Sequence, residues 1–146
     1  MPATSAAKLY TPDILALAVS LASYPTLPAP ALHGEARSRT CGSAVEVSLL
    51  PDGSGLIEHV GMQVRACAVG QAAAALFARS AAGTGIVEIE RTLDQLAGWL
   101  EQDGALPDWP GLDLLSGARA FPARHGAILL PWKAAQQALG KAVPAG

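Results

Sequence analysis

One stretch of the sequence has the period of a β-strand, and it limits the folds open to this chain more than any other feature. Here Val45, Val47 and Leu49 alternate with small or polar residues, as expected of a strand with one buried face. Residues 51–55 then read Pro-Asp-Gly-Ser-Gly, which is a strong turn signal. A second extended stretch follows the turn, so residues 42–65 predict an antiparallel hairpin.

A third strand and a first helix are predicted on either side of this hairpin. Residues 62–66 predict a separate third strand that continues after a break at Gly61. Ahead of the hairpin, Thr11-Pro12-Asp13 is a good helix start, with a hydroxyl cap, a proline at the first helical position and an acid at the positive end. Prolines at positions 25, 28 and 30 end that helix, so residues 25–40 predict an irregular loop.

Helical patterns dominate the second half of the chain. Helices are predicted over residues 68–82, 87–100, 112–117 and 127–139. This order of elements predicts one α+β domain over residues 9–140, in which a small antiparallel sheet of about three strands packs against several helices. Residues 1–8 and 141–146 are predicted to be flexible termini.

The composition excludes several classes of protein. A chain of 146 residues is about one domain's worth, and 51% hydrophobic against 15% charged residues excludes a disordered chain. The net charge of −2 and the scattered basic residues argue against nucleic acid as a partner. No apolar run reaches the roughly 20 residues that span a bilayer, and no signal-peptide pattern is present. We therefore expect a cytoplasmic protein without a membrane partner, in which cysteines stay reduced.

Both cysteines stand at the ends of predicted elements. Cys67 falls where the strands pass into a helix, and the first turn of a helix offers free backbone N–H groups and the positive end of the macrodipole. Both features favour a thiolate, the form that binds metal, and Arg65 can add positive charge. Cys41 lies just before the first strand of the hairpin, and Gly42 lets the backbone come close to whatever Cys41 holds. Because free cysteines are often simply buried, inert packing stays an open alternative for each.

His125 is the histidine best placed to join the cysteines. It precedes the predicted C-terminal helix, where a third ligand to a shared metal can reach in, although a lone histidine is more often a surface residue. His33 lies in the predicted loop and His59 at an exposed position of the second strand, so both are weaker candidates. No Ser–His–Asp set can be assigned, and the turn at residues 52–55 lacks the acid that a calcium loop needs.

Four short motifs together resemble a known family. The stretch from Leu9 to Leu15 is similar to that family's opening helix, and Thr-Cys-Gly-Ser at residues 40–43 precedes an alternating strand. Cys-Ala-Val-Gly at residues 67–70 opens a helix of small residues, and Arg-His-Gly-Ala at residues 124–127 precedes the last predicted helix. In this order and spacing, the motifs resemble the NifU N-terminal domain family, which includes the IscU and SufU iron–sulfur scaffolds.

The resemblance implies a SufE/NifU-like α+β fold and a function. It implies a scaffold rather than an enzyme, one that receives sulfur from a cysteine desulfurase, assembles a [2Fe–2S] cluster and passes it to iron–sulfur acceptor proteins. The implied ligands of iron or of the cluster are Cys41, Cys67 and His125. The chain departs from the family's pattern at Ser43, where an aspartate is usual, and at Gly126, where the third cysteine is usual.

Several alternatives stay open. The two thiolates and the imidazole are also a ligand set for zinc with an open fourth position, as in a SufU-like sulfur-transfer partner of a desulfurase. A family member that has lost ligands can instead keep the fold and bind a partner without metal. A cysteine hydrolase needs Cys67 activated by a histidine next to an oxyanion site, and no substrate pocket is indicated. A homodimer, in which a second protomer completes the site, is open as well.

Overall fold

The computed structural model describes residues 9–39, 42–101 and 104–141. Cys41 lies outside the described residues, and so do the segments predicted to be flexible termini, apart from Lys141.

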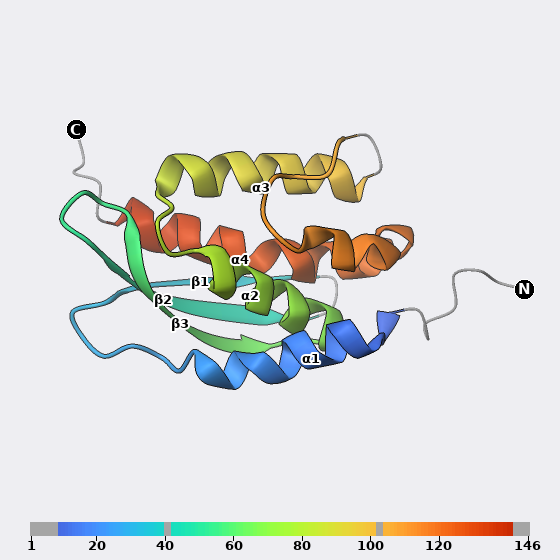
Figure 1. The fold of residues 1–146 in the computed structure, drawn as a ribbon, viewed down its shortest axis with the longest axis horizontal. Coiled ribbons are helices and arrows are strands. Elements are labelled where there is room, and N and C mark those ends of the chain that lie inside the picture. Colours follow the sequence, from blue (N-terminus) through green and yellow to red (C-terminus); the bar gives the residue numbers. More distant parts are fainter. Residues whose placement is uncertain (1–8, 40–41, 102–103, 142–146) are drawn as a thin grey trace, which may run out of the picture.

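The described residues contain a three-stranded antiparallel sheet with the strand order β1-β2-β3. Its strands are β1 (Leu32–Arg37), β2 (Ala44–Pro51) and β3 (Ile57–Arg65). The alternating residues of β2 place Val45, Val47 and Leu49 in the core, as the period of two predicts. Helices cover this inner face of the sheet (Figure 1), so the predicted α+β fold with a small antiparallel sheet is confirmed.

Two details of the predicted sheet are wrong. The prolines predict an irregular loop over residues 25–40, yet β1 forms within it, because its backbone pairs with β2 along its whole length. The predicted separate strand at residues 62–66 is the end of β3, which runs without a break through Gly61, opposite Ser48. The number of strands is therefore right, but the third strand precedes the hairpin instead of following it.

The predicted turn between β2 and β3 is confirmed. One carboxylate oxygen of Asp52 accepts hydrogen bonds from the backbone N–H and the hydroxyl of Ser54, at 2.8 and 2.7 Å, and from the backbone N–H of Leu56 at 3.1 Å. These bonds stabilise the charged form, and those from Ser54, led by its hydroxyl, do most to hold the pKa of Asp52 below its ordinary value. The side chain of Asp52 therefore closes the turn as an Asx turn does.

Helical segments make up most of the remaining described chain. They are α1 (Pro12–Ser20), the 3₁₀ turn η2 (Leu21–Ser23), α2 (Ala68–Ser80), α3 (Ile86–Leu100), the 3₁₀ segment η3 (Leu112–Ala120) and α4 (Pro122–Gly140). The predicted cap of α1 is confirmed, because the side chain of Thr11 accepts a hydrogen bond from the backbone N–H of Ile14 at 3.2 Å. Within the described residues, no helix is both long and apolar enough to span a bilayer.

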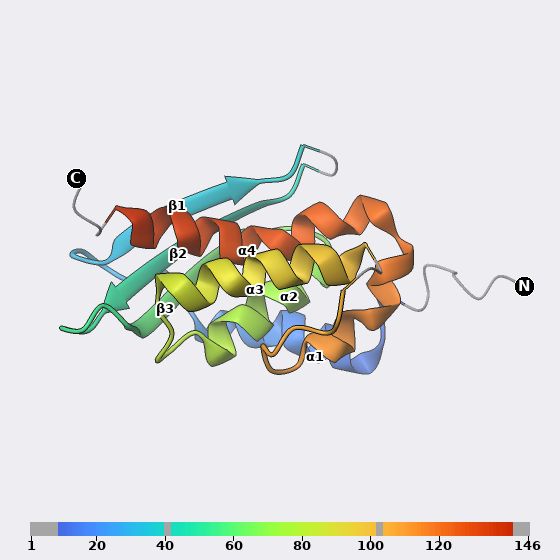
Figure 2. The same ribbon diagram turned by 90° about the horizontal axis from the view of Figure 1, so that it is seen from above.

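The helices form layers on the sheet. α4 packs on β1 and β2, and α2 packs on β3 and on α4. α3 then lies along α4 on the side away from the sheet, while α1 packs on α2 at the edge of the molecule (Figures 1 and 2). Between these layers, Phe77 stacks on Trp109 with ring centroids 5.5 Å apart, and Trp132 meets both rings edge-on.

Candidate functional site

The sheet brings the first two cysteine motifs to the same end of the molecule. Ala44 starts β2 and lies opposite Arg65, the last residue of β3. The chain just before Ala44 and just after Arg65 therefore leaves the sheet at one end. Ser43 and Cys67, which are far apart in the sequence, lie at this end because of this register.

Cys67 caps the N-terminus of α2, as predicted. Its backbone is extended, with φ −66° and ψ 172°, and its carbonyl oxygen accepts the first helical hydrogen bond from Gln71 at 2.9 Å. The side-chain amide of Gln71 also donates to the carbonyl oxygen of Ala66 at 2.9 Å, which fixes the turn around the cysteine. The Cys67 side chain is half-buried and packs against the hydrophobic core. Its thiol thus lies at the positive end of a helix.

The motif at residues 124–127 lies next to the first turn of α2, because α2 and α4 approach closely at Gly70. A Cβ atom on Gly70 would lie 3.2 Å from the Cβ atom of Ala127 and 2.7 Å from that of Ala66. Only glycine fits between these neighbours without displacing one of them. The first turn of α2 and the start of α4 are therefore in contact.

The same part of α4 also contacts the loop that carries Cys41. A Cβ atom on Gly126 would lie 2.6 Å from the hydroxyl oxygen of Ser38, which follows β1. The loop is closed by two backbone hydrogen bonds, from the N–H of Ser38 to Ser43 at 2.8 Å and from the N–H of Gly42 to Ser38 at 3.0 Å. Gly42 has a φ of 72°, in the left-handed region that favours glycine.

Both departures from the family's pattern, Gly126 and Ser43, lie where the loop after β1 meets α4. Gly126 stands where the third cysteine is usual, and the Ser38 hydroxyl fills the space next to it. Ser43, which stands where the aspartate is usual, is buried. Thr40 and Cys41 lie outside the described residues, so the predicted role of Cys41 stays a prediction.

His125 lies inside a helix and not before one. α4 begins at Pro122, and the prediction that His125 precedes the last helix is wrong, because proline at the first helical position starts the helix earlier. The ring Nε2 of His125 lies 3.0 Å from the carbonyl oxygen of Arg119. Since a carbonyl oxygen only accepts hydrogen bonds, Nε2–H is the donor here, and in the neutral ring Nδ1 then carries the lone pair.

The two weaker histidine candidates are exposed. His33 lies in β1 and not in a loop, with its side chain in solvent. His59 lies in β3, where 61% of its side chain is exposed, as predicted. Within the described ranges, no group of three His, Cys, Asp or Glu side chains lies close enough to hold a metal ion. The ligand set of Cys41, Cys67 and His125 is therefore an expectation that the described residues do not test.

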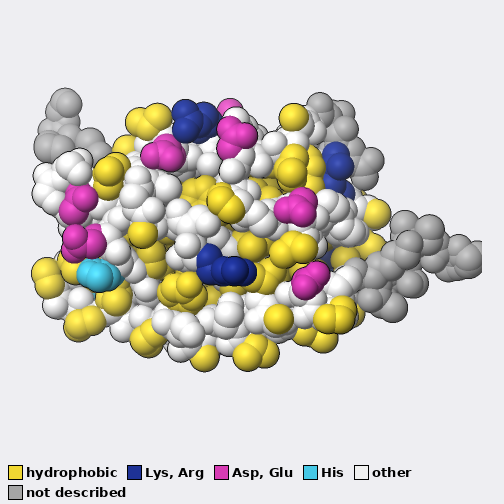
Figure 3. Space-filling model, in the orientation of Figure 1, with side chains coloured by type: hydrophobic (Ala, Val, Ile, Leu, Met, Phe, Trp, Pro, Cys, Tyr) yellow, Lys and Arg dark blue, Asp and Glu magenta, His cyan; other side chains and the backbone are white. Residues whose placement is uncertain are grey.

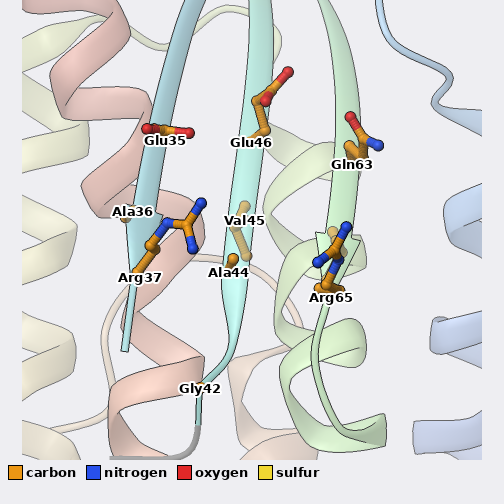
Figure 4. A pocket seen from close by; sticks show the side chains of 10 residues that line it. Glu35, Ala36, Arg37, Gly42, Ala44, Val45, Glu46, Gln63 and Arg65 are labelled. Atoms are coloured by element: carbon orange, nitrogen blue, oxygen red, sulfur yellow. The ribbon is translucent and has the colours of Figure 1, made fainter. Parts of the chain in front are cut away.

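The outer face of the sheet carries two arginines at this same end (Figure 4). Arg37, Ala44 and Arg65 lie opposite one another across the three strands. They line a shallow hollow of about 240 Å³ together with residues of the next row, which holds Glu35, Glu46 and Gln63. Among the described residues, neither arginine is in a salt bridge. Positive charge therefore flanks the start of the loop that carries Cys41.

Sequence reasoning missed two parts of this site. Ser38 falls in the segment predicted as an irregular loop, and no local pattern indicates that it meets Gly126. The row of Arg37 and Arg65 depends on the register of β1 against β2, and β1 was not predicted. The period of two within residues 32–37 is the only signal that could have revealed it.

Comparisons with known proteins support the fold and the resemblance. The N-terminal part of a NifU-like protein from Brucella abortus matches with a TM-score of 0.83 and 26% identity, over 92% of this chain and 94% of that one. A putative iron–sulfur cluster assembly scaffold protein for the SUF system, from Fervidobacterium islandicum AW-1, matches with a TM-score of 0.80 and 20% identity, over 92% and 99%. A hypothetical protein matches with a TM-score of 0.65 and 17% identity, over 87% and 96%. No known family model and no curated protein matches the sequence.

These findings define the class of protein. The chain has the fold of iron–sulfur cluster assembly scaffolds, and the described residues of the second, third and fourth motifs lie at one end of the sheet. The resemblance predicted from the motifs is confirmed: the chain is similar to a NifU-like N-terminal domain and shares its fold with a putative SUF-system scaffold.

Proposed function

We propose that this protein is an iron–sulfur cluster assembly scaffold, which binds iron or a [2Fe–2S] cluster as its cargo and passes it to acceptor proteins. The observation that carries this proposal is the meeting of three distant motifs. At one end of a scaffold-like fold, the start of α4 contacts Ser38 at Gly126, and it also contacts the first turn of α2, which Cys67 caps, at Ala127. The protein acts in this account as a carrier and not as an enzyme.

The donor atoms proposed for the cargo are two thiolates and one imidazole. Cys67 contributes a thiol at the N-terminus of α2, and Cys41 comes from the neighbouring loop. His125 offers Nδ1, because its Nε2–H is held by the carbonyl oxygen of Arg119. A hydrogen bond of this kind from the second ring nitrogen is typical of histidines that bind metal, because it fixes the tautomer and the orientation of the ring.

Charge around the site favours anionic sulfur. The positive end of α2 lies at Cys67, and Arg37 and Arg65 border the loop from the outer face of the sheet. A cluster with thiolate ligands is anionic, so both features stabilise it. Because Gly126 and Ser43 supply neither thiolate nor carboxylate, the cargo has fewer protein ligands than the family's pattern provides. An exogenous thiol or a partner then completes the coordination, which suits a cargo that must be released.

The proposed partners follow from this cargo. A cysteine desulfurase supplies sulfur, and iron–sulfur acceptor proteins take the finished cluster. SufU/NifU-like scaffolds work with such proteins, and the end of the molecule where the motifs meet is the surface that both partners would have to approach. We place this exchange in the cytoplasm, where thiols stay reduced.

Anaerobic reconstitution with ferrous iron and sulfide tests this proposal. The wild-type protein is expected to gain visible absorption bands from sulfur-to-iron charge transfer, and Cys67→Ser and Cys41→Ser are each expected to abolish them. His125→Ala is expected to weaken the bands, whereas His59→Ala, which removes an exposed histidine in β3, serves as the matched control. A colourless wild-type protein, or bands that persist in Cys67→Ser, would contradict the proposal. A protein that takes up zinc and no cluster would support sulfur transfer instead.

A further inference from the structure

The outer face of the sheet is covered in its middle and open at one end. Residues 25–27 cross this face over β2 and β3, where the backbone N–H of Leu27 donates to the hydroxyl of Ser48 at 2.9 Å. A Cβ atom on Gly61, the partner of Ser48 on β3, would collide with the carbonyl oxygen of Pro25. Ser48 is buried by this crossing. The hollow of Figure 4 is the part of the face that lies beyond it, toward the candidate functional site.

Two rows of opposite charge line this hollow. In one row, Arg37 and Arg65 stand on either side of Ala44, two strand spacings or about 10 Å apart. The small side chain of Ala44 leaves the space between them open. The next row holds Glu35 and Glu46, and it lies one step of roughly 7 Å further along the strands. Cationic and anionic side chains therefore line one hollow, within the reach of one small molecule.

The charges of the two rows do not neutralise one another. In the part of the chain that the structure describes, none of these four side chains is in a salt bridge. Glu46 is half-buried and the other three are exposed. In Figure 4, the guanidinium group of Arg37 points from β1 toward β2. Both signs of charge are therefore available to a ligand in the hollow.

A ligand that satisfies both rows carries an anionic and a cationic group close together. Guanidinium groups bind carboxylates through paired hydrogen bonds, and carboxylates accept the three hydrogen bonds that an ammonium group donates. The α-amino-acid head contains both groups. The hollow of about 240 Å³ is smaller than the pockets of about 300–1,000 Å³ that hold drug-sized ligands. This size favours a free amino acid.

The hollow opens onto the candidate functional site. Its lining includes Gly42, the neighbour of Cys41 in the sequence, and Arg65 precedes Cys67 by two residues. A ligand whose head lies between the two rows can extend its side chain past the end of the sheet toward Cys67. A side chain that ends in a thiol would bring there the sulfur that Gly126 lacks.

We propose that the hollow binds the α-amino-acid head of a small thiol, of which L-cysteine is the simplest, and presents its sulfur to the cargo. Arg37 and Arg65 hold the carboxylate, and Glu35 and Glu46 hold the ammonium group. The thiol releases its proton to solvent and its sulfur donates an electron pair to iron, so nothing is oxidised or reduced. The role of the sulfur rests on the proposed function, whereas binding of the head can be measured without any cargo.

Titration of the cargo-free protein under reducing conditions, followed by amide chemical shifts in NMR spectra, tests the binding of the head. L-cysteine and S-methyl-L-cysteine share the head and are expected to bind alike. Cysteamine lacks the carboxylate and 3-mercaptopropionate lacks the ammonium group, so each is expected to bind at least about fivefold more weakly. Equal binding of all four probes, or no binding of L-cysteine, overturns the proposal.

Charge-removing variants assign each end of the head to its row. Arg37→Gln is expected to lower the affinity for L-cysteine but not for cysteamine, and Glu46→Gln to lower it for L-cysteine but not for 3-mercaptopropionate. Glu58→Gln is the matched control, because Glu58 is a 57% exposed acid on β3, 3.7 Å from His59. It lies near the turn between β2 and β3, the end where Figure 3 shows a histidine beside acidic side chains. Variants at the hollow that weaken all probes equally, or none, would rule out the charge contacts.

Glutathione distinguishes two sources of the thiol, because it carries the same head on a longer molecule. Weaker binding of glutathione than of L-cysteine identifies the free amino acid as the ligand, as the size of the hollow predicts. Tighter binding identifies a peptide thiol with the same head.

Reconstituted protein tests whether the bound sulfur serves the cargo. With L-cysteine as the added thiol, the visible bands are expected to survive a chelator several times longer than with cysteamine, and Arg37→Gln is expected to remove this difference. Equal lifetimes with both thiols overturn the role of the sulfur as a ligand. The absence of bands in every sample contradicts the proposed function as well, while the titration of the cargo-free protein still decides whether the head binds.

Discussion

At the scale of single residues, the contact between Ser38 and Gly126 explains how this chain differs from the pattern it resembles. Gly126 occupies the place of the third cysteine, and the Ser38 hydroxyl lies where its side chain would begin. A thiol cannot be restored at position 126 without moving Ser38. The absence of a side chain at Gly126 thus allows Ser38, at the start of the loop after β1, to pack against α4.

A double-mutant cycle tests this pairing. Gly126→Ala alone is expected to leave the free energy of unfolding unchanged or lower it, because the gain in helix propensity is offset by crowding against Ser38. In the background of Ser38→Ala, the hydroxyl is absent and the new Cβ makes an ordinary contact at 3.4 Å. There, Gly126→Ala is expected to stabilise the protein by about 1 kcal/mol. Urea unfolding of the four proteins gives the coupling, and equal effects of Gly126→Ala in both backgrounds would rule the pairing out.

The sequence predicts the role of a residue when that role depends on residues close to it along the chain. The cap by Thr11, the turn at Asp52 and the helix start at Cys67 depend on neighbours in the sequence, and the sequence predicts all three. The bond from His125 to Arg119 and the contact of Ser38 with Gly126 depend on how elements pack. No local pattern contains that information.

At the scale of elements, β1 is the strand that the sequence did not predict. Its core-facing residues are Leu32, Gly34 and Ala36, which alternate with charged or polar residues but bring little apolar area. The strand is held by its pairing with β2 and by α4, which comes very close to Gly34. Its edge is covered as well, since the side chain of Gln137 accepts from the N–H of Glu35 at 2.7 Å. Tertiary contacts, rather than propensity, make it a strand.

Gly34→Ala tests how closely α4 must approach β1. A Cβ atom here would collide with the backbone oxygen of Ala134 and lie 2.7 Å from the backbone nitrogen of Ala138. Because backbone atoms cannot move aside, the substitution is expected to lower the free energy of unfolding by roughly 1–3 kcal/mol.

Gly98→Ala in α3 is the matched control for this substitution. A Cβ atom on Gly98 has no described atom within 4 Å, so the change is expected to stabilise the protein by about 0.5–1 kcal/mol. Chemical denaturation measures both variants. If Gly34→Ala is as harmless as Gly98→Ala, then α4 does not hold β1 in the way described here.

At the scale of the whole molecule, the sequence predicts the fold class but not the way the motifs meet. The change from helical period to period two and back indicates an α+β chain, but the place of the third strand along the chain was predicted wrongly. The contact between the first turn of α2 and α4 depends on the small residues Gly70 and Ala127 at a helix crossing. Such a crossing can be recognised only once both helices are placed.

The most direct test of the proposed function is the metal and sulfide content of the protein purified without oxygen. We expect iron and acid-labile sulfide in comparable amounts in the wild-type protein, and the loss of both in Cys67→Ser. Elemental analysis combined with a sulfide assay measures these quantities on one sample. Protein that carries neither iron nor sulfide, or that carries stoichiometric zinc in their place, would contradict the assignment as an iron–sulfur scaffold.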